Sequence, residues 1–320
     1  MKLYVFTTLA FYLALIPPLD AEHQQSFSFF NDLQLTYGFR LSAVRSSFSP
    51  NEVKNILATD DAKTPSWRLA QWGTRFSLQS AEEQVLPDGT RILENEGKTV
   101  KILPGGLAGE GVYLQVNGGA EYGDRLRQHG EAWPHLLIEQ KLDARPLAEF
   151  TAVPFTVDFR VEKCDAATNT PMDKGLHTAH ITAFWTVHNI NKNSNDHNNM
   201  IWFGVPLYDV RYPNPRGHQA LDVGQADATG KFICTIPGDR FFDEPIAIGN
   251  WYALSCDLAP LIQEALAQSQ EKGFLTDTKY EDLAASSFNL GWEVPGTYDC
   301  AITLRNLTLI GRIGRIGPIK

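Results

Sequence analysis

The chain has 320 residues, of which 43% are hydrophobic and 20% charged, the balance of a globular protein with one large domain or two small ones. Its formal net charge is −9 and it has no long basic run, which argues against a nucleic-acid partner and against an anionic membrane surface. We find no internal repeat and, beyond the N-terminus, no apolar segment long enough to span a membrane.

The N-terminus has the pattern of a secretory signal. Lys2 precedes an apolar run over residues 3–16, and the small residue Ala21 offers a cleavage site. A membrane anchor is the alternative, but the run is short for one, since a span takes about 20 apolar residues. We therefore expect a secreted protein, extracellular or periplasmic. The expected divisions are a signal peptide at 1–21, an N-terminal segment at 22–64 and a main domain at 65–320.

Four cysteines are present, and an even count in an exported chain allows two disulfides. Of the three possible pairings we favour Cys234–Cys256, which would close a local hairpin, and Cys164–Cys300, which would tie a mid-chain strand to a late one. Free buried thiols are the alternative. The spacing fits no zinc pattern, so we expect no metal and no cofactor.

The first predicted element is a short helix that ends near Ala58. Ser49 and Pro50, before Asn51, have the residue types of a capping position and a first helical position. From Trp67 onward the pattern changes to strand after strand, separated by clusters of Pro, Gly, Asn and Asp.

Several segments in the middle of the chain alternate between apolar and polar residues, as strands with one packed face do. The polar faces of these segments include Asp158 and Arg160, then His180 and His188, then Asn198, Met200 and Trp202. One longer helix is predicted near residues 258–272, because Asp257 can cap its start and Gly273 its end. Many short strands with one main helix predict an all-β fold, a two-sheet antiparallel β-sandwich of the jelly-roll type.

A late segment, residues 288–294, alternates in the same way. Phe288, Leu290, Trp292 and Val294 share an apolar face, while Asn289, Gly291 and Glu293 share the other. A lone carboxylate on a strand face, with a glycine two residues before it that clears space, suits a groove that contacts a polar ligand.

The run Asn198-Asn199-Met200-Ile201-Trp202-Phe203 resembles the strand Glu-x-Met-Ile-Trp-Leu of family-twelve glycoside hydrolases, retaining β-glucanases with a concanavalin A-like jelly roll. The order of the later elements is also similar: a helix, the strand with Gly291-Trp292-Glu293, then a final strand. The resemblance covers residues 175–312. It implies that Glu293 occupies the acid/base position, whereas Asn198 stands where the family has its nucleophilic Glu. Because an Asn cannot readily form the covalent intermediate, the resemblance supports a groove more than the family's reaction.

The candidate site residues follow from these patterns. Glu293, Asp209 and Asp158 are the candidate catalytic carboxylates. The candidate substrate-binding residues are Asn198, Trp202, Met200, Arg160, His180, His188 and Arg211. Trp202 can stack on a sugar ring, or it is core if a loop covers its face. Asp209 and Arg211 can contact sugar hydroxyls or form a structural ion pair. The segment from Arg125 to His135 is a candidate rim of the groove.

Three functions remain open. The first is a glycan-binding jelly roll that recognises polysaccharide in a groove without chemistry, and we favour it. The second is a polysaccharide-cleaving enzyme: a glycoside hydrolase with Glu293 as acid and Asp158 or Asp209 activating water, or a lyase on acidic glycans in which Arg160 or Arg211 neutralises a uronate. The third is a structural or adhesion protein whose groove is filled. Architecture alone cannot choose among them, and the oligomeric state stays open.

Overall fold

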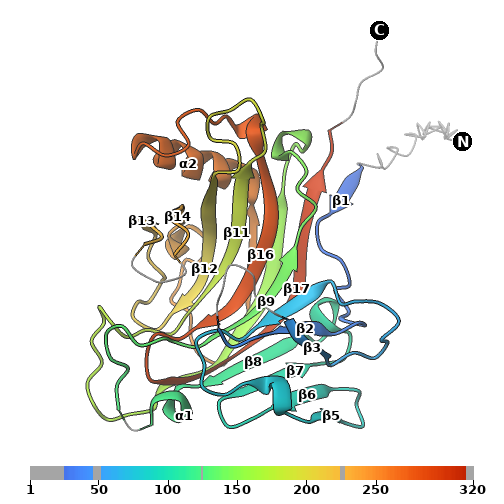
Figure 1. Ribbon diagram of the computed structural model, residues 1–320, viewed down its shortest axis with the longest axis vertical. Coiled ribbons are helices and arrows are strands. Elements are labelled where there is room, and N and C mark those ends of the chain that lie inside the picture. The colour runs from blue at the N-terminus through green and yellow to red at the C-terminus, as the bar shows by residue number, and fades with distance from the viewer. Residues whose placement is uncertain (1–24, 46–51, 124, 224–227, 315–320) are drawn as a thin grey trace, which may run out of the picture.

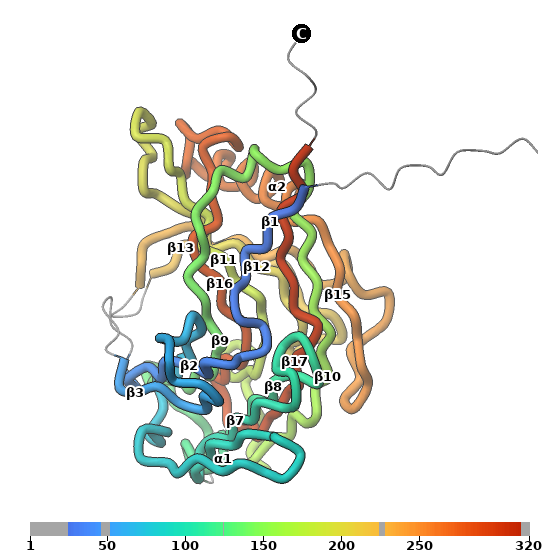
Figure 2. The backbone as a smooth tube through the Cα atoms, turned by 90° about the vertical axis from the view of Figure 1, so that its right-hand side faces the viewer, coloured from blue at the N-terminus to red at the C-terminus, as the bar shows by residue number. Residues whose placement is uncertain are grey.

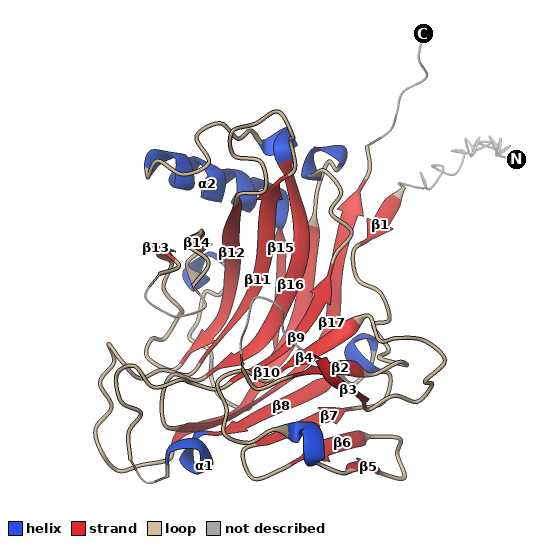
Figure 3. Ribbon diagram, viewed as in Figure 1, coloured by secondary structure: helices blue, strands red, loops and turns tan. Residues whose placement is uncertain are grey.

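The computed structural model of the chain describes residues 25–45, 52–123, 125–223 and 228–314. The expected signal peptide lies outside these residues. Two mostly antiparallel sheets pack face to face and form one curved β-sandwich (Figures 1 and 3), so the predicted jelly-roll architecture is confirmed. No helix in these ranges has the length and apolar character needed to cross a membrane.

The first sheet has eight strands in the order β15-β10-β17-β8-β7-β6-β5, with β1 paired to β17. Figure 2 shows β1 beside β17. The bounds are β1 Ser26–Ser28, β5 Glu83–Val85, β6 Arg91–Glu94, β7 Lys98–Ile102, β8 Val112–Asn117, β10 Pro154–Ala166, β15 Tyr252–Asp257 and β17 Tyr298–Arg312.

The second sheet has nine strands in the order β13-β14-β12-β11-β16-β9-β4-β2-β3. Two of its pairs, β12 with β14 and β2 with β4, are parallel. The bounds are β2 Phe39–Ser42, β3 Glu52–Ile56, β4 Trp67–Ala70, β9 His135–Lys141, β11 His180–Asn189, β12 Met200–Asp209, β13 His218–Leu221, β14 Phe232–Thr235 and β16 Leu283–Glu293.

The predicted main helix is confirmed as α2, Leu258–Glu271, and the Asp257 side chain accepts a hydrogen bond from the Ala259 N–H at 3.1 Å. It buries Leu261, Ile262 and Leu266 and contacts β12 and β14. The other helical segments in the described chain are short. They are α1 Gly118–Tyr122 and the 3₁₀ turns η1 Leu78–Ser80, η2 Gly106–Ala108, η3 Leu147–Glu149, η4 Gly238–Arg240 and η5 Tyr280–Asp282.

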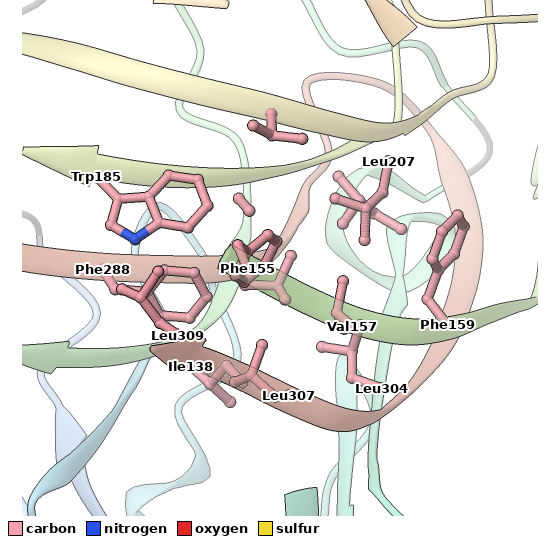
Figure 4. Packing of buried hydrophobic residues seen from close by; sticks show 14 of the residues in the cluster. Ile138, Phe155, Val157, Phe159, Trp185, Leu207, Phe288, Leu304, Leu307 and Leu309 are labelled. Atoms are coloured by element: carbon pink, nitrogen blue, oxygen red, sulfur yellow. The ribbon is translucent and has the colours of Figure 1, made fainter. Parts of the chain in front are cut away.

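The core lies between the two sheets (Figure 4). The ring of Trp185 on β11 is 4.8 Å from that of Phe155 on β10 and 5.3 Å from that of Phe288 on β16, centroid to centroid. All three are buried, so the alternation correctly predicted the inward face of each strand. The opposite face of the nine-stranded sheet is therefore left for polar side chains and a ligand.

Two local predictions are wrong. Residues Glu52–Ile56 form strand β3 rather than a helix, because they pair with β2 at the edge of the nine-stranded sheet, and such pairing overrides weak local signals. Ser49, Pro50 and Asn51 lie outside the described residues.

The expected Cys234–Cys256 hairpin is also absent, because β14 and β15 belong to different sheets. Cys164 and Cys300 do lie directly opposite each other on β10 and β17. All four cysteines are nevertheless free thiols in the structure.

Candidate functional site

A cleft of about 1580 Å³ opens on the outer face of the nine-stranded sheet. Its floor consists of the outward side chains of β9, β16, β11 and β12, and its walls are loops near both edges of the sheet, beside β2 and β4 on one side and beside β12 and β13 on the other. The floor includes His135, Leu137, Asn289, Glu293, His180, Thr182, Phe184, Trp202, Pro206, Tyr208 and Asp209. The walls include Arg45, Trp72, Arg75, Glu131, Trp133, Arg211, Tyr212, Arg216 and Asp222.

Strand register places four titratable residues in one row across this floor. His135 on β9 lies opposite Glu293 on β16, Glu293 lies opposite His180 on β11, and His180 lies opposite Asp209 on β12. The Glu293 Oε2 atom is 3.4 Å from Nε2 of His135 and 3.7 Å from Nε2 of His180. Glu293 thus lies between two imidazoles on the cleft floor.

The two histidines keep Glu293 ionised. Burial raises the pKa of this carboxyl, but the hydrogen bond from His135 and the charges of His135 and His180 outweigh burial and lower its pKa to about 2. At neutral pH Glu293 is therefore a carboxylate and carries no proton to give. This protonation state disagrees with the role of acid that the resemblance implies for it.

His135 is held by two hydrogen-bond acceptors. Its Nδ1 atom is 3.1 Å from the carbonyl oxygen of Trp133, and its Nε2 atom faces the Glu293 carboxylate. Since a neutral imidazole has only one N–H, hydrogen bonds to both acceptors require a proton on each nitrogen. A protonated His135 can donate to both acceptors, so the site places an imidazole beside the Glu293 carboxylate. The rings of Trp72 and Trp133 flank His135 at 6.0 and 5.8 Å between centroids.

Gly291 has a different role from the expected one. Its φ is +155°, and a Cβ atom there would lie 2.2 Å from the carbonyl oxygen of Leu136 on β9. A side chain would clash with the neighbouring backbone rather than fill the cleft. Glycine at this position lets β16 approach β9, which is what brings Glu293 to His135.

Asp209 lies in the same row but is engaged by its own chain. Its Oδ1 atom accepts from Nε of Arg211 at 2.9 Å and from the Thr178 hydroxyl at 2.9 Å, and its Oδ2 atom accepts from Nη2 of Arg211 at 2.6 Å. Burial raises its pKa, but the hydrogen bonds of Arg211 outweigh burial and lower it. Both residues line the cleft, and their mutual arrangement is the strand-end ion pair that was the alternative interpretation.

The end of the segment from Arg125 to His135 lines the cleft at Glu131, Ala132, Trp133 and His135, and Arg127 holds the segment in place. The guanidinium of Arg127 is buried and donates to the carbonyl oxygens of Pro295 at 2.9 Å and Leu176 at 2.8 Å, which belong to two other segments. It also donates to the carbonyl oxygens of Gln128 and Glu131 in its own loop. Its charged group lies 5.3 Å from the ring centroid of Trp133.

The structure corrects the placement of Asp158 and Arg160. Both are on β10, in the other sheet, and neither lines the cleft. Asp158 accepts from the Asn306 side chain at 2.7 Å, and Arg160 lies over the ring of Trp251 at 4.9 Å. The alternation correctly placed them on a polar strand face, but the sequence did not say which sheet that face belongs to.

Three further candidates lie outside the cleft lining. Asn198 is exposed in the turn before β12, with φ +65°, and Met200 is buried. Nδ1 of His188 and the hydroxyl of Ser286 share a hydrogen bond of 2.6 Å, and burial lowers the pKa of His188. Trp202 does line the cleft, and its indole N–H donates to the Thr229 hydroxyl at 3.1 Å.

Sequence reasoning placed Trp133 on a candidate rim but missed Trp72 and the pairing of His135 with Glu293. Arg68 lies over Trp72 at 5.2 Å and is ion-paired with Glu139 at 2.8 Å. Burial raises the pKa of Glu139 to about 7, although Arg68 opposes the shift. The available signal was the alternation in 135–139, where His135 and Glu139 share a face. Across the described ranges no group of three or more His, Cys, Asp or Glu is placed to hold a metal ion.

Comparison with known proteins shows similarity in the fold only. No family model and no curated protein matches the sequence. Similar solved structures include a family 12 xyloglucanase from Bacillus licheniformis, at 11% identity over 72% of this chain and 97% of that chain, with a TM-score of 0.40. Endoglucanase cel12A from Rhodothermus marinus is 12% identical over 73% of this chain and 97% of that chain, with a TM-score of 0.35. The family 11 xylanase from Neocallimastix patriciarum is 9% identical over 72% of this chain and 95% of that chain, with a TM-score of 0.35. At these values the likeness carries no argument about function, which has to come from the cleft itself.

Proposed function

We propose that the protein binds a polysaccharide chain in the cleft. The observation that carries the proposal is the cleft itself: its volume of about 1580 Å³ exceeds the 300–1,000 Å³ typical of sites for compact small molecules. Trp72, Trp133, Trp202 and Tyr212 line it together with charged groups. Aromatic faces pack on sugar rings while polar groups bond the hydroxyls, so such a lining suits an extended glycan.

The test uses two tryptophan variants. Trp202→Ala removes a cleft-lining ring and is expected to weaken glycan affinity about tenfold, since contacts of this kind contribute about 1–2 kcal/mol. Trp251→Ala is the matched control, because Trp251 lies between Arg160 and Arg305, outside the cleft lining. Equal affinities of the two variants for a panel of polysaccharides, or no binding by the parent protein, would contradict the proposal.

Cleavage is the second candidate, and the His135–Glu293 pair favours it. A carboxylate can accept a proton and a protonated imidazole beside it can donate one, and together they meet the requirement for general acid–base catalysis. Glu293→Gln would then abolish turnover while glycan binding persists. If the protein only binds, the same variant keeps most of the affinity and the parent releases no product. Assays for new reducing ends and for unsaturated products distinguish hydrolysis from elimination.

The structure supports acid–base chemistry by the His135–Glu293 pair better than it supports a hydrolase that uses two carboxylates. Such enzymes place their carboxyl groups about 5–5.5 Å or 6.5–9.5 Å apart, and one of them must be protonated. Asp209 is the only other carboxylate in the row, two strands from Glu293, or roughly 10 Å between Cα atoms. It is ion-paired with Arg211, and the pKa of both acids is lowered. Neither acid is thus a ready proton donor.

We also propose that the chain acts outside the cell. The support is the signal-like pattern of residues 1–21. Mass spectrometry of the secreted protein tests the proposal, and a mature N-terminus at Glu22 is the expected result. A product that retains residues 1–21 inside the cell would refute it.

A further inference from the structure

We propose that the glycan recognised by this cleft is anionic, bearing carboxylate or sulfate groups along its chain. The inference rests on the proposed glycan-binding function and specifies the class of ligand. It comes from the distribution of charge in the cleft, which differs from that of the chain as a whole.

The chain as a whole is acidic, with a formal net charge of −9. The cleft lining is not: it holds five arginines and five carboxylates, so its formal charge is zero before three histidines are counted. One of these histidines, His135, faces two hydrogen-bond acceptors, and it donates to both only when its ring is protonated and positive. The cleft is thus a relatively positive region of a negative molecule.

Three of the five lining carboxylates are already paired with a lysine or an arginine, two of them with cations that do not line the cleft. Glu121 is paired with the buried Lys98 at 3.8 Å, and Glu131 with Arg125 at 2.7 Å. Asp209 is balanced by Arg211, which lines the cleft beside it. The remaining carboxylates are Glu293, between its two histidines, and Asp222.

Three lining arginines have no such partner. Within the described ranges, Arg45, Arg75 and Arg216 make no ion pair with a carboxylate, and all three are exposed. Arg45 follows β2 and Arg75 follows β4, near one edge of the nine-stranded sheet, while Arg216 precedes β13 at the other edge. The unpaired cations therefore stand at both sides of the cleft, where successive charged sugars of one bound chain would lie.

The wall beside His135 adds hydrogen-bond donors without acceptors. Nε and Nη2 of Arg68 and the indole N–H groups of Trp72 and Trp133 have no hydrogen-bond acceptor among the described residues. These atoms are shielded from solvent in this conformation, so a ligand oxygen would reach them after a side-chain rotation. Buried donors without acceptors are costly, and carboxylate or sulfate oxygens are acceptors of the kind they lack.

The experiment measures affinity for four probes as a function of salt: polygalacturonate, dextran sulfate, unmodified dextran and polyglutamate. We expect the two anionic glycans to bind most tightly and to weaken with salt, because exposed charge pairs are screened. Polygalacturonate and dextran sulfate distinguish carboxylate from sulfate. Polyglutamate separates glycan recognition from attraction to any polyanion.

Arg75→Gln and Arg216→Gln are each expected to weaken binding of the preferred anionic glycan about threefold to fivefold, and the double variant about tenfold or more. Lys192→Gln is the control of equal charge change, since Lys192 is exposed and outside the cleft lining. Tight binding of dextran with no effect of the arginine variants would overturn this inference while glycan binding stands. Polyglutamate binding as tight as that of the anionic glycans would overturn it as well. Absence of binding to every glycan would refute the proposed function together with it.

Discussion

Arg127 offers a direct test of how the cleft wall is held in place. Arg127→Ala removes two hydrogen bonds between segments, to Pro295 and Leu176, and the stacking on Trp133. Charged hydrogen bonds contribute about 1.5 kcal/mol each at the lower end, and the stacking adds about 0.5–1 kcal/mol. We therefore expect the free energy of unfolding to fall by about 4 kcal/mol, measured by urea denaturation at neutral pH.

The matched control lies two residues away. The Arg125 side chain is exposed, and its contacts with described residues lie within its own loop, to Glu131 at 2.7 Å and to the Leu126 carbonyl. Arg125→Ala should cost far less than Arg127→Ala, because exposed ion pairs contribute little. Arg127→Lys keeps the charge but loses the planar fork, so it should recover only a small part of the stability. Equal losses for Arg127→Ala and Arg125→Ala would show that the buried guanidinium does not join the three segments.

Three further predictions follow from the same geometry. The folded-state pKa of Glu293 is about 2 against an ordinary 4.5, so the stability that its ionised form contributes is present above about pH 4.5 and is lost as the pH falls toward 2. This contribution is of the order of 3 kcal/mol. Between pH 6 and pH 3 the free energy of unfolding, measured with urea, should therefore fall less in Glu293→Gln than in the parent. Gly291→Ala should destabilise the protein by about 3 kcal/mol or more because the added Cβ clashes with the Leu136 carbonyl. Gly130→Ala is the control and should cost about 1 kcal/mol, since Gly130 has φ +81° but no atom within 4 Å of the added Cβ. Similar decreases in Tm for the two variants would contradict this reasoning. Alkylation of the denatured, unreduced protein should modify all four cysteines, as free thiols require; modification of only Cys234 and Cys256 would instead show a Cys164–Cys300 bridge between the facing strands.

The sequence was sufficient for the architecture because the alternation of apolar and polar residues is a local property. Trp185, Phe288 and Phe155 fall on the apolar faces of their strands and meet in the core as expected. The helix at Leu258–Glu271 was equally predictable, since its Asp257 cap and Gly273 lie next to it in the chain. The strand at Glu52–Ile56 was not predictable, because its structure depends on pairing with β2.

The site depends on strand order and register, which the alternation does not contain. Glu293 was predicted to face a groove, and it does, but its partners His135 and His180 come from strands that are 158 and 113 residues earlier in the chain. Asp158 has the same local pattern as a groove residue, yet β10 belongs to the other sheet. A one-residue change of register would also have exchanged the faces, so only the pairing identifies the row on the cleft floor.

Two ionic clusters lie close to the cleft, and their difference indicates which one contacts a ligand. Lys98 and Glu121 are almost fully buried, and both charged groups have hydrogen-bond partners within the protein. Lys98 donates to the Thr74 hydroxyl at 2.5 Å and to the Phe76 carbonyl. Glu121 accepts from the Thr74 hydroxyl and from the Arg75 backbone N–H. Burial lowers the pKa of Lys98 to about 8, and the hydrogen bonds of the pair to Thr74, Arg75 and Phe76 hold the loop that follows Trp72. Glu293, His135 and His180 instead remain 22–24% exposed on the cleft floor. A perturbed pKa occurs in both clusters, but only the open one combines it with access to a ligand, and for that reason we assign recognition or chemistry to Glu293 and structural support to Lys98.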